Sequence, residues 1–141
     1  MATYSTIGQP VPRIEGPEKV TGATRYAADV LLPGTLWCKV LRSPLPHARI
    51  VRIDTRRAAA LPGVRAVLTG ADLPPDTRVG RRMRDMPVLA TDRVRFVGEK
   101  VAAVAAEEPD IAEEAVTLID VEYEELPAVF DPLEAMQPGA P

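Results

Sequence analysis

The 141-residue chain has only one cysteine, Cys38, and one histidine, His47. A zinc or iron–sulfur site needs several thiolate or imidazole ligands that converge on one point, so this chain alone cannot build one. A single cysteine also excludes an internal disulfide and is typical of a reducing compartment, which predicts a cytoplasmic protein. Cys38 lies within an apolar strand pattern, which predicts a buried and inert thiol.

The parts of a nucleophilic or phosphate-binding site are missing as well. Ser43 and His47 are close in sequence, but the proline-containing segment between them is extended and holds the two side chains apart. We expect His47 to hydrogen bond within a bend instead. The glycine patterns GxGxxG and GxxxxGKS/T are absent. The residues therefore show no autonomous active site.

Long apolar runs and a strong net charge are also lacking. No stretch approaches the roughly 18 consecutive apolar residues of a membrane span. The N-terminus does not show the charged and then apolar pattern of a signal peptide. The net charge of −3 gives no global attraction to nucleic acid, and aromatic residues are not interleaved with the basic ones. We expect neither a membrane span nor a nucleic-acid partner.

The chain does have enough apolar residues, 46%, for one domain with a real core. The clearest pattern covers residues 93–130. Val94 and Phe96 alternate with arginines, as in a half-buried strand, and a turn follows. The apolar run 101–106 predicts a strand that is covered on both faces. Residues 109–119 form an amphipathic helix whose carboxylates face solvent, and a closing strand follows. A helix between two strands indicates an α/β or α+β fold.

The first half of the chain has a similar outline. A short helix, capped by Asp54 or Thr55, is expected over about 55–61. Strands are expected over residues 36–42, 49–54 and 64–69. With the longer helix over about 109–119, this gives two main helices beside a mixed β-sheet.

Three segments lie outside these elements. Residues 1–25 are rich in proline and glycine and predict an extended N-terminal arm, which packs either on the domain at 26–132 or on a partner. Residues 133–141 predict a linker. Within the domain, residues 75–92 form an irregular loop that is either a solvated segment or a contact surface, since arginine and methionine are enriched at interfaces. The candidate contact residues in this loop are Arg78, Val79, Arg81, Arg82, Met83, Arg84 and Met86.

Four stretches together carry a family resemblance: PRIEGPEKVTGATRYAADV (12–30), LRSPLPHARIVRIDTRRAAALPGVRAVLTGADLP (41–74), RVRFVGEKVAAVAAE (93–107) and VEYEELPAVFDP (121–132). In this order and with these gaps, they closely resemble the a/b hammerhead domain that opens the large subunit of the xanthine dehydrogenase / aldehyde oxidase family of molybdenum hydroxylases. The resemblance covers nearly the whole chain. It implies an α+β hammerhead fold, with Gly22 and Gly98 at the turns of the family.

The resemblance implies more about a parent enzyme than about this chain. Such enzymes hydroxylate an aldehyde or an N-heterocycle with water as the oxygen source. They use molybdenum–molybdopterin, iron–sulfur (2Fe-2S) clusters and FAD. The cofactor-binding loops and the catalytic base lie further along the large subunit. No catalytic, cofactor-binding or metal residue is therefore carried over to this chain, and we expect this fragment to bind no cofactor and to be inactive alone.

The implied partners are the rest of the molybdenum-binding subunit and the iron–sulfur and FAD domains or subunits. The linker at 133–141 would then lead toward a molybdenum-cofactor domain. In the family, the variable loop tends to lie toward the substrate funnel. We therefore expect its apolar residues to line the entrance and its arginines to act as contact or steering charges. The alternatives are a stand-alone scaffold or binding module with this fold and an unrelated small hydrolase.

Overall fold

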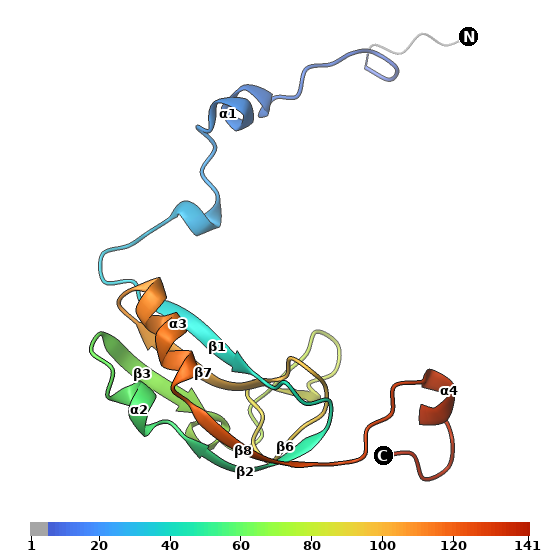
Figure 1. Cartoon of the computed structure of the whole chain (residues 1–141). Coiled ribbons are helices and arrows are strands. Elements are labelled where there is room, and N and C mark those ends of the chain that lie inside the picture. The colour runs from blue at the N-terminus through green and yellow to red at the C-terminus, as the bar shows by residue number, and fades with distance from the viewer. Residues whose placement is uncertain (1–5) are drawn as a thin grey trace. The chain divides into compact units, whose positions relative to one another are not determined.

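The computed structural model describes residues 6–141, and the chain divides into two compact units, Met1–Thr35 and Leu36–Pro141 (Figure 1). In the first unit, α1 (Gly16–Thr21) interrupts the arm that was expected to be extended, and the short 3-10 helix η1 (Ala27–Asp29) follows. Pro17 lies in the first turn of α1, where its missing N–H needs no partner. Gly22 ends α1 with a left-handed φ of 74°.

The second unit is built around the strand β7 (Lys100–Ala106), which lies between β1 (Trp37–Arg42) and β3 (Val64–Thr69). Both pairings are antiparallel. The prediction that the apolar run 101–106 is a strand covered on both faces is confirmed. Ala102 and Val104 belong to one buried cluster, and Val101 belongs to another.

A second sheet contains β6 (Arg93–Val94), β2 (Ala48–Asp54) and β8 (Asp120–Glu125), in that order. A separate hairpin is formed by β4 (Arg78–Val79) and β5 (Met86–Pro87). The strand pairings within residues 6–141 are all antiparallel. The α+β class is therefore confirmed. The helix α3 (Pro109–Thr117) connects strands of two different sheets, β7 and β8 (Figure 1).

The helices complete the core on one face of the first sheet. The helix α2 (Arg56–Ala59) contributes Ala58 to the cluster with Val104, and α3 contributes Ala115. The apolar stripe predicted for the longer helix is confirmed, and the carboxylates of its opposite face are exposed. The remaining elements are the 3-10 helix η2 (Gly70–Asp72) and α4 (Pro132–Ala135). None of the helices in residues 6–141 has the length and apolar character needed to cross a membrane.

Two predicted burials are wrong. Cys38 is exposed, because β1 is an edge strand whose side chains have strand neighbours on one side only. Phe96 is 49% exposed, although the alternating pattern placed it on the buried face with Val94. The strand β6 ends at Val94, and the chain turns before Phe96 can reach the core.

Candidate functional site

The predicted contact residues lie on the β4–β5 hairpin. Val79 pairs with Met86, and Arg78 pairs with Pro87. The Arg78 guanidinium also donates from Nη1 to the Asp85 carbonyl oxygen over 2.9 Å, which ties the two arms together. The segment that was expected to be irregular is thus a small ordered hairpin. All seven candidate residues are exposed, namely Arg78, Val79, Arg81, Arg82, Met83, Arg84 and Met86.

The tip of the hairpin requires glycine at position 80. A Cβ atom on Gly80 would lie 1.6 Å from the carbonyl oxygen of Met83, which no real contact permits. The tight tip presents Met83 to solvent with 72% of its surface exposed. Close backbone approach is the property that selects glycine here.

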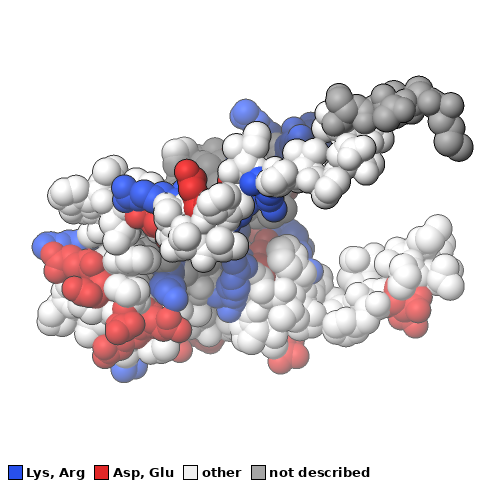
Figure 2. Space-filling view, turned by 90° about the horizontal axis from the view of Figure 1, so that it is seen from above, with Lys and Arg blue, Asp and Glu red and all other residues white. Residues whose placement is uncertain are grey.

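The hairpin is strongly basic for its size. Between positions 78 and 87 there are four arginines and only one acidic residue, Asp85, whereas the whole chain has a net charge of −3. None of these arginines forms an ion pair within the part of the chain that the structure describes. Elsewhere, on the face drawn in Figure 2, acidic and basic side chains are interspersed. The hairpin is therefore a local source of positive potential.

The hollow at the base of the hairpin is too small for a substrate. It encloses about 90 Å³ between Leu73, Thr77 and Leu89, whereas ligand pockets measure roughly 300–1,000 Å³. A larger open cleft of about 380 Å³ lies between β2 and the segment from Val67 to Asp72. The Asp72 carboxylate in this cleft already accepts the Thr69 backbone N–H over 2.7 Å and the Thr69 hydroxyl over 2.8 Å. These bonds give Asp72 a structural role.

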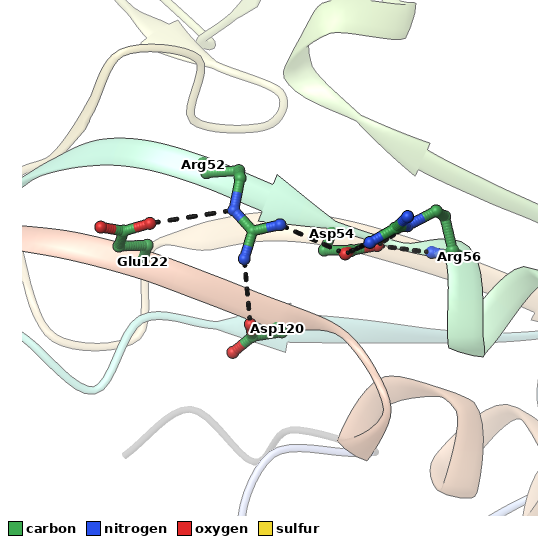
Figure 3. A network of polar contacts seen from close by, with 5 residues as sticks. All are labelled: Arg52, Asp54, Arg56, Asp120 and Glu122. Carbon is green, nitrogen blue, oxygen red and sulfur yellow. Dashed lines mark hydrogen bonds and ion pairs between the residues drawn. The ribbon is translucent and has the colours of Figure 1, made fainter.

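A charged network joins β2, β8 and α2 (Figure 3). Arg52 contacts Asp54 over 3.3 Å, Asp120 over 3.5 Å and Glu122 over 3.8 Å. The Asp54 carboxylate also accepts the backbone N–H of Arg56 over 3.1 Å and its Nε–H over 3.0 Å. The expected capping of the short helix is therefore provided by Asp54, whereas the Thr55 side chain makes no cap bond.

The electrostatics of this network indicate a structural role, in which the ion pairs hold α2 against β2 and β8. Hydrogen bonds from the side chain and then from the backbone of Arg56, with the nearby charges of Arg56 and Arg52, hold the pKa of Asp54 well below its usual range. A carboxylate kept ionised by two guanidinium groups has no proton to donate near neutral pH and is a weak base, so this arrangement favours a structural role. No sequence pattern indicates this network, because its partners lie on three different elements.

The other reactive groups are also engaged in local structure. The Ser43 hydroxyl donates to the Leu45 carbonyl oxygen over 2.9 Å and accepts the Leu45 N–H over 3.0 Å. His47 lies in the bend before β2, and its Nδ1 is 2.6 Å from the carbonyl oxygen of Pro127. Across residues 6–141, no three His, Cys, Asp or Glu side chains are grouped so that they could hold a metal ion. The described residues therefore do not offer the thiolate and imidazole ligand set of a zinc or iron–sulfur centre.

Comparisons with known proteins agree on one family. The sequence model described as "Aldehyde oxidase and xanthine dehydrogenase, a/b hammerhead domain" matches residues 21–127. A probable xanthine dehydrogenase component of Bacillus subtilis is 49% identical over 128 residues, which are 91% of this chain and 17% of that protein. The nicotinate dehydrogenase large molybdopterin subunit of Eubacterium barkeri is 40% identical over 138 residues, which are 98% of this chain and 32% of that protein.

Comparison with solved structures indicates the same family. The quinoline 2-oxidoreductase of Pseudomonas putida 86 superposes with a TM-score of 0.82 at 46% identity, over 90% of this chain and 17% of that one. The Cu,Mo-CO dehydrogenase superposes with a TM-score of 0.89 at 43% identity, over 95% of this chain and 17% of that one. This chain thus spans a small part of the length of its relatives. The chain belongs to the aldehyde oxidase and xanthine dehydrogenase family, and its residues 21–127 match the a/b hammerhead domain of that family.

Proposed function

We propose that this chain is the N-terminal hammerhead domain of the large subunit of a molybdenum-dependent hydroxylase, in which it is a structural and interface part. The match of residues 21–127 to the family carries the proposal. Relatives named as large subunits of nicotinate and carbon monoxide dehydrogenases support it. The parent enzyme would oxidise an aldehyde or an N-heterocycle with water as the oxygen source. Its molybdenum–molybdopterin would supply the redox chemistry, and iron–sulfur and FAD domains or subunits would carry the electrons away.

The surface of the second unit supports an interface role. Large apolar side chains that a domain leaves exposed are available for burial by a neighbouring domain or subunit. Here the exposed large apolar residues are Leu36, Trp37, Val51, Leu68, Val79, Met83, Met86, Phe96, Val97, Phe130, Leu133 and Met136. In the proposed parent, neighbouring domains and subunits would cover part of this set.

The β4–β5 hairpin would border the route by which substrate enters. Val79, Met83 and Met86 offer exposed apolar surface for that role. The arginines of the hairpin, Arg78, Arg81, Arg82 and Arg84, would act as contact or steering charges. A basic patch raises the local concentration of anions, so an anionic substrate would gain most from it.

The domain assignment is tested by isolating both the chain and its parent. We expect the source cell to contain a longer polypeptide that includes this sequence, co-purifies with molybdenum and reduces a dye on addition of an aldehyde or heterocycle. The chain of residues 1–141, purified alone, is expected to bind no molybdenum and to show no turnover. Turnover at a specific pocket of the isolated chain would overturn the proposal, as would a source cell that makes only the short chain.

The hairpin assignment needs a separate test in the parent enzyme. Replacing the four hairpin arginines by glutamine keeps the length of the segment and removes its charge. We expect a lower kcat/KM for anionic substrates at low ionic strength and a smaller difference at high ionic strength, because salt screens steering. Arg57→Gln, on the exposed side of α2, is the matched control. An unchanged substrate profile and unchanged assembly after the hairpin is replaced by a neutral segment would contradict this role.

A further inference from the structure

The turn Arg95–Glu99 exposes two large apolar side chains next to each other. The Glu99 N–H donates to the Phe96 carbonyl oxygen over 3.2 Å, and Gly98 has a left-handed φ of 91°. Phe96 is 49% exposed and Val97 is 61% exposed. Two consecutive, exposed apolar residues, one aromatic and one β-branched, are more useful at an interface than on a free domain.

This turn is fixed by buried groups beneath it. The Gly98 N–H donates to the Ser43 carbonyl oxygen over 2.8 Å, and the Ser43 N–H donates to the Glu99 carbonyl oxygen over 2.9 Å. Ser43 is 2% exposed and Glu99 is 4% exposed. The Glu99 carboxylate accepts the backbone N–H of Arg95 and pairs with the Arg95 guanidinium. Both ends of the turn are therefore held in place.

A fixed turn changes the energetics of binding. A mobile loop loses conformational entropy when a partner orders it, and that loss opposes association. The Arg95–Glu99 turn has already lost this freedom on folding. Its two exposed side chains can therefore bind an apolar pocket with little further ordering, which is how anchor residues at interfaces behave.

The chain leaves β8 at the same end of the second unit as this turn. Ala48 pairs with Val94, just before the turn, and also with Glu125, at the end of β8. The Leu126 N–H then donates to the His47 carbonyl oxygen over 2.9 Å. Polypeptide that follows β8 thus starts close to the turn, as the course of the chain beyond β8 in Figure 1 illustrates.

We propose that Phe96 and Val97 anchor this domain in an apolar pocket of the large-subunit polypeptide that follows it. The inference rests on the proposed function, since it requires that polypeptide to exist. This chain spans 17% of the xanthine dehydrogenase relative, so most of such a subunit lies outside it. The downstream polypeptide is favoured over a separate subunit because it would be covalently tethered through the segment that leaves β8 beside the turn, which raises its effective concentration there.

Cysteine labelling tests the docking directly. In a Cys38→Ser background, Val97→Cys places a thiol on the turn, and Glu114→Cys places one on the exposed face of α3 as the control. Each variant is prepared in the chain of residues 1–141 and in the full-length parent. A maleimide is added, and peptide mass spectrometry follows the labelling of each position separately, so that other cysteines of the parent do not interfere. Phe96→Cys serves as a second reporter on the same turn.

The expected result separates the two positions. The thiol at position 97 should react about tenfold or more slowly in the parent than in the short chain, because an interface core is packed as tightly as a protein interior. The thiol at position 114 should react at the same rate in both. Equal labelling of position 97 in an existing parent overturns the docking and leaves the proposed function standing. If the thiols at positions 97 and 114 are slowed to the same extent in the parent, the protection is not specific to the turn, and the proposed anchor role of Phe96 and Val97 is overturned as well. A source cell that lacks a longer polypeptide overturns both proposals together.

Discussion

Val104 in the central strand β7 lies directly opposite Val67 in the edge strand β3. Val104 is fully buried and packs in a cluster with Ala58 of α2 and Ala115 of α3, and Val67 borders the same cluster. Directly opposed side chains on one face of an antiparallel pair are in contact. This valine pair therefore joins the sheet to both helices.

Val104→Ala should destabilise the chain more than a change at an exposed position nearby. Removing two buried methyl groups costs about 2–3 kcal/mol of unfolding free energy, because the lost transfer term and the cavity add. Urea denaturation followed by circular dichroism measures this difference. Leu68→Ala, at a neighbouring position with substantial exposure, is the control and should cost about 1 kcal/mol or less. If the two variants shift the midpoint equally, the core has been placed wrongly.

Glu99→Gln tests the brace beneath the Arg95–Glu99 turn. The amide has almost the same shape as the carboxylate, but it loses the charge-assisted bonds with Arg95. We expect a loss of about 1–2 kcal/mol in unfolding free energy and faster amide hydrogen exchange at residues 96–98. Glu114→Gln, on the exposed face of α3, should leave both measurements unchanged. Unaltered exchange in the Glu99 variant would show that the backbone bonds of Ser43 suffice to fix the turn.

The sequence predicts the centre of this fold better than its edges. The apolar run 101–106 and the amphipathic helix that follows carry their own periodicity, so the central strand and α3 are found where the pattern places them. Cys38 and Phe96 lie where strand neighbours are missing or where a strand stops early. Burial at such positions depends on what packs against them, and a local pattern contains no information about that.

The candidate site, like the fold, was predicted from the sequence only in part. Composition alone singled out the arginines and methionines of the hairpin, because they differ from the rest of the chain. The pairing of β4 with β5 was not predicted, since strands of two residues have no measurable period. The Ser43–Glu99 brace and the network around Arg52 join residues far apart in sequence. Only the folded chain brings these groups together.

Gly80→Ala should disturb the hairpin and leave the core intact. The added methyl group would overlap the carbonyl oxygen of Met83, so the tip must open. We expect a local cost of roughly 1–3 kcal/mol that appears as greater proteolytic cleavage between residues 78 and 87. The urea midpoint should change little, because the hairpin lies outside the two buried clusters. Gly16→Ala, at the start of α1, is a control, since its φ is not left-handed and its added methyl group would meet only the Arg13 Cβ atom at an ordinary 3.6 Å. A cleavage pattern identical to that of the unmodified chain would contradict the tight tip.

Asp54→Asn should make the stability of the chain less sensitive to acid. Hydrogen bonds from Arg56 and the charge of Arg52 lower the pKa of the Asp54 carboxyl in the folded chain. In the unfolded chain this pKa returns to about 3.9, so the unfolded state takes up a proton first as the pH falls. The stabilisation from Asp54 is therefore complete above the unfolded pKa and is lost as the pH falls toward the folded one. Asp72, whose pKa is lowered by the backbone N–H and hydroxyl of Thr69, acts in the same direction.

Urea unfolding measured at a series of pH values from about 7 to 2 tests this assignment. The unmodified chain should lose stability steeply below about pH 4, whereas Asp54→Asn should start lower at neutral pH and fall less. The matched control is Glu114→Gln, which removes one carboxylate from the exposed face of α3 without touching this network. Added salt should reduce the difference between the Asp54 variant and the unmodified chain, because the guanidinium partners are exposed and their charges are screened. Parallel curves for the Asp54 variant and the unmodified chain would mean that this carboxylate is equally well stabilised by water, and the network in Figure 3 would then not brace α2 against the two strands.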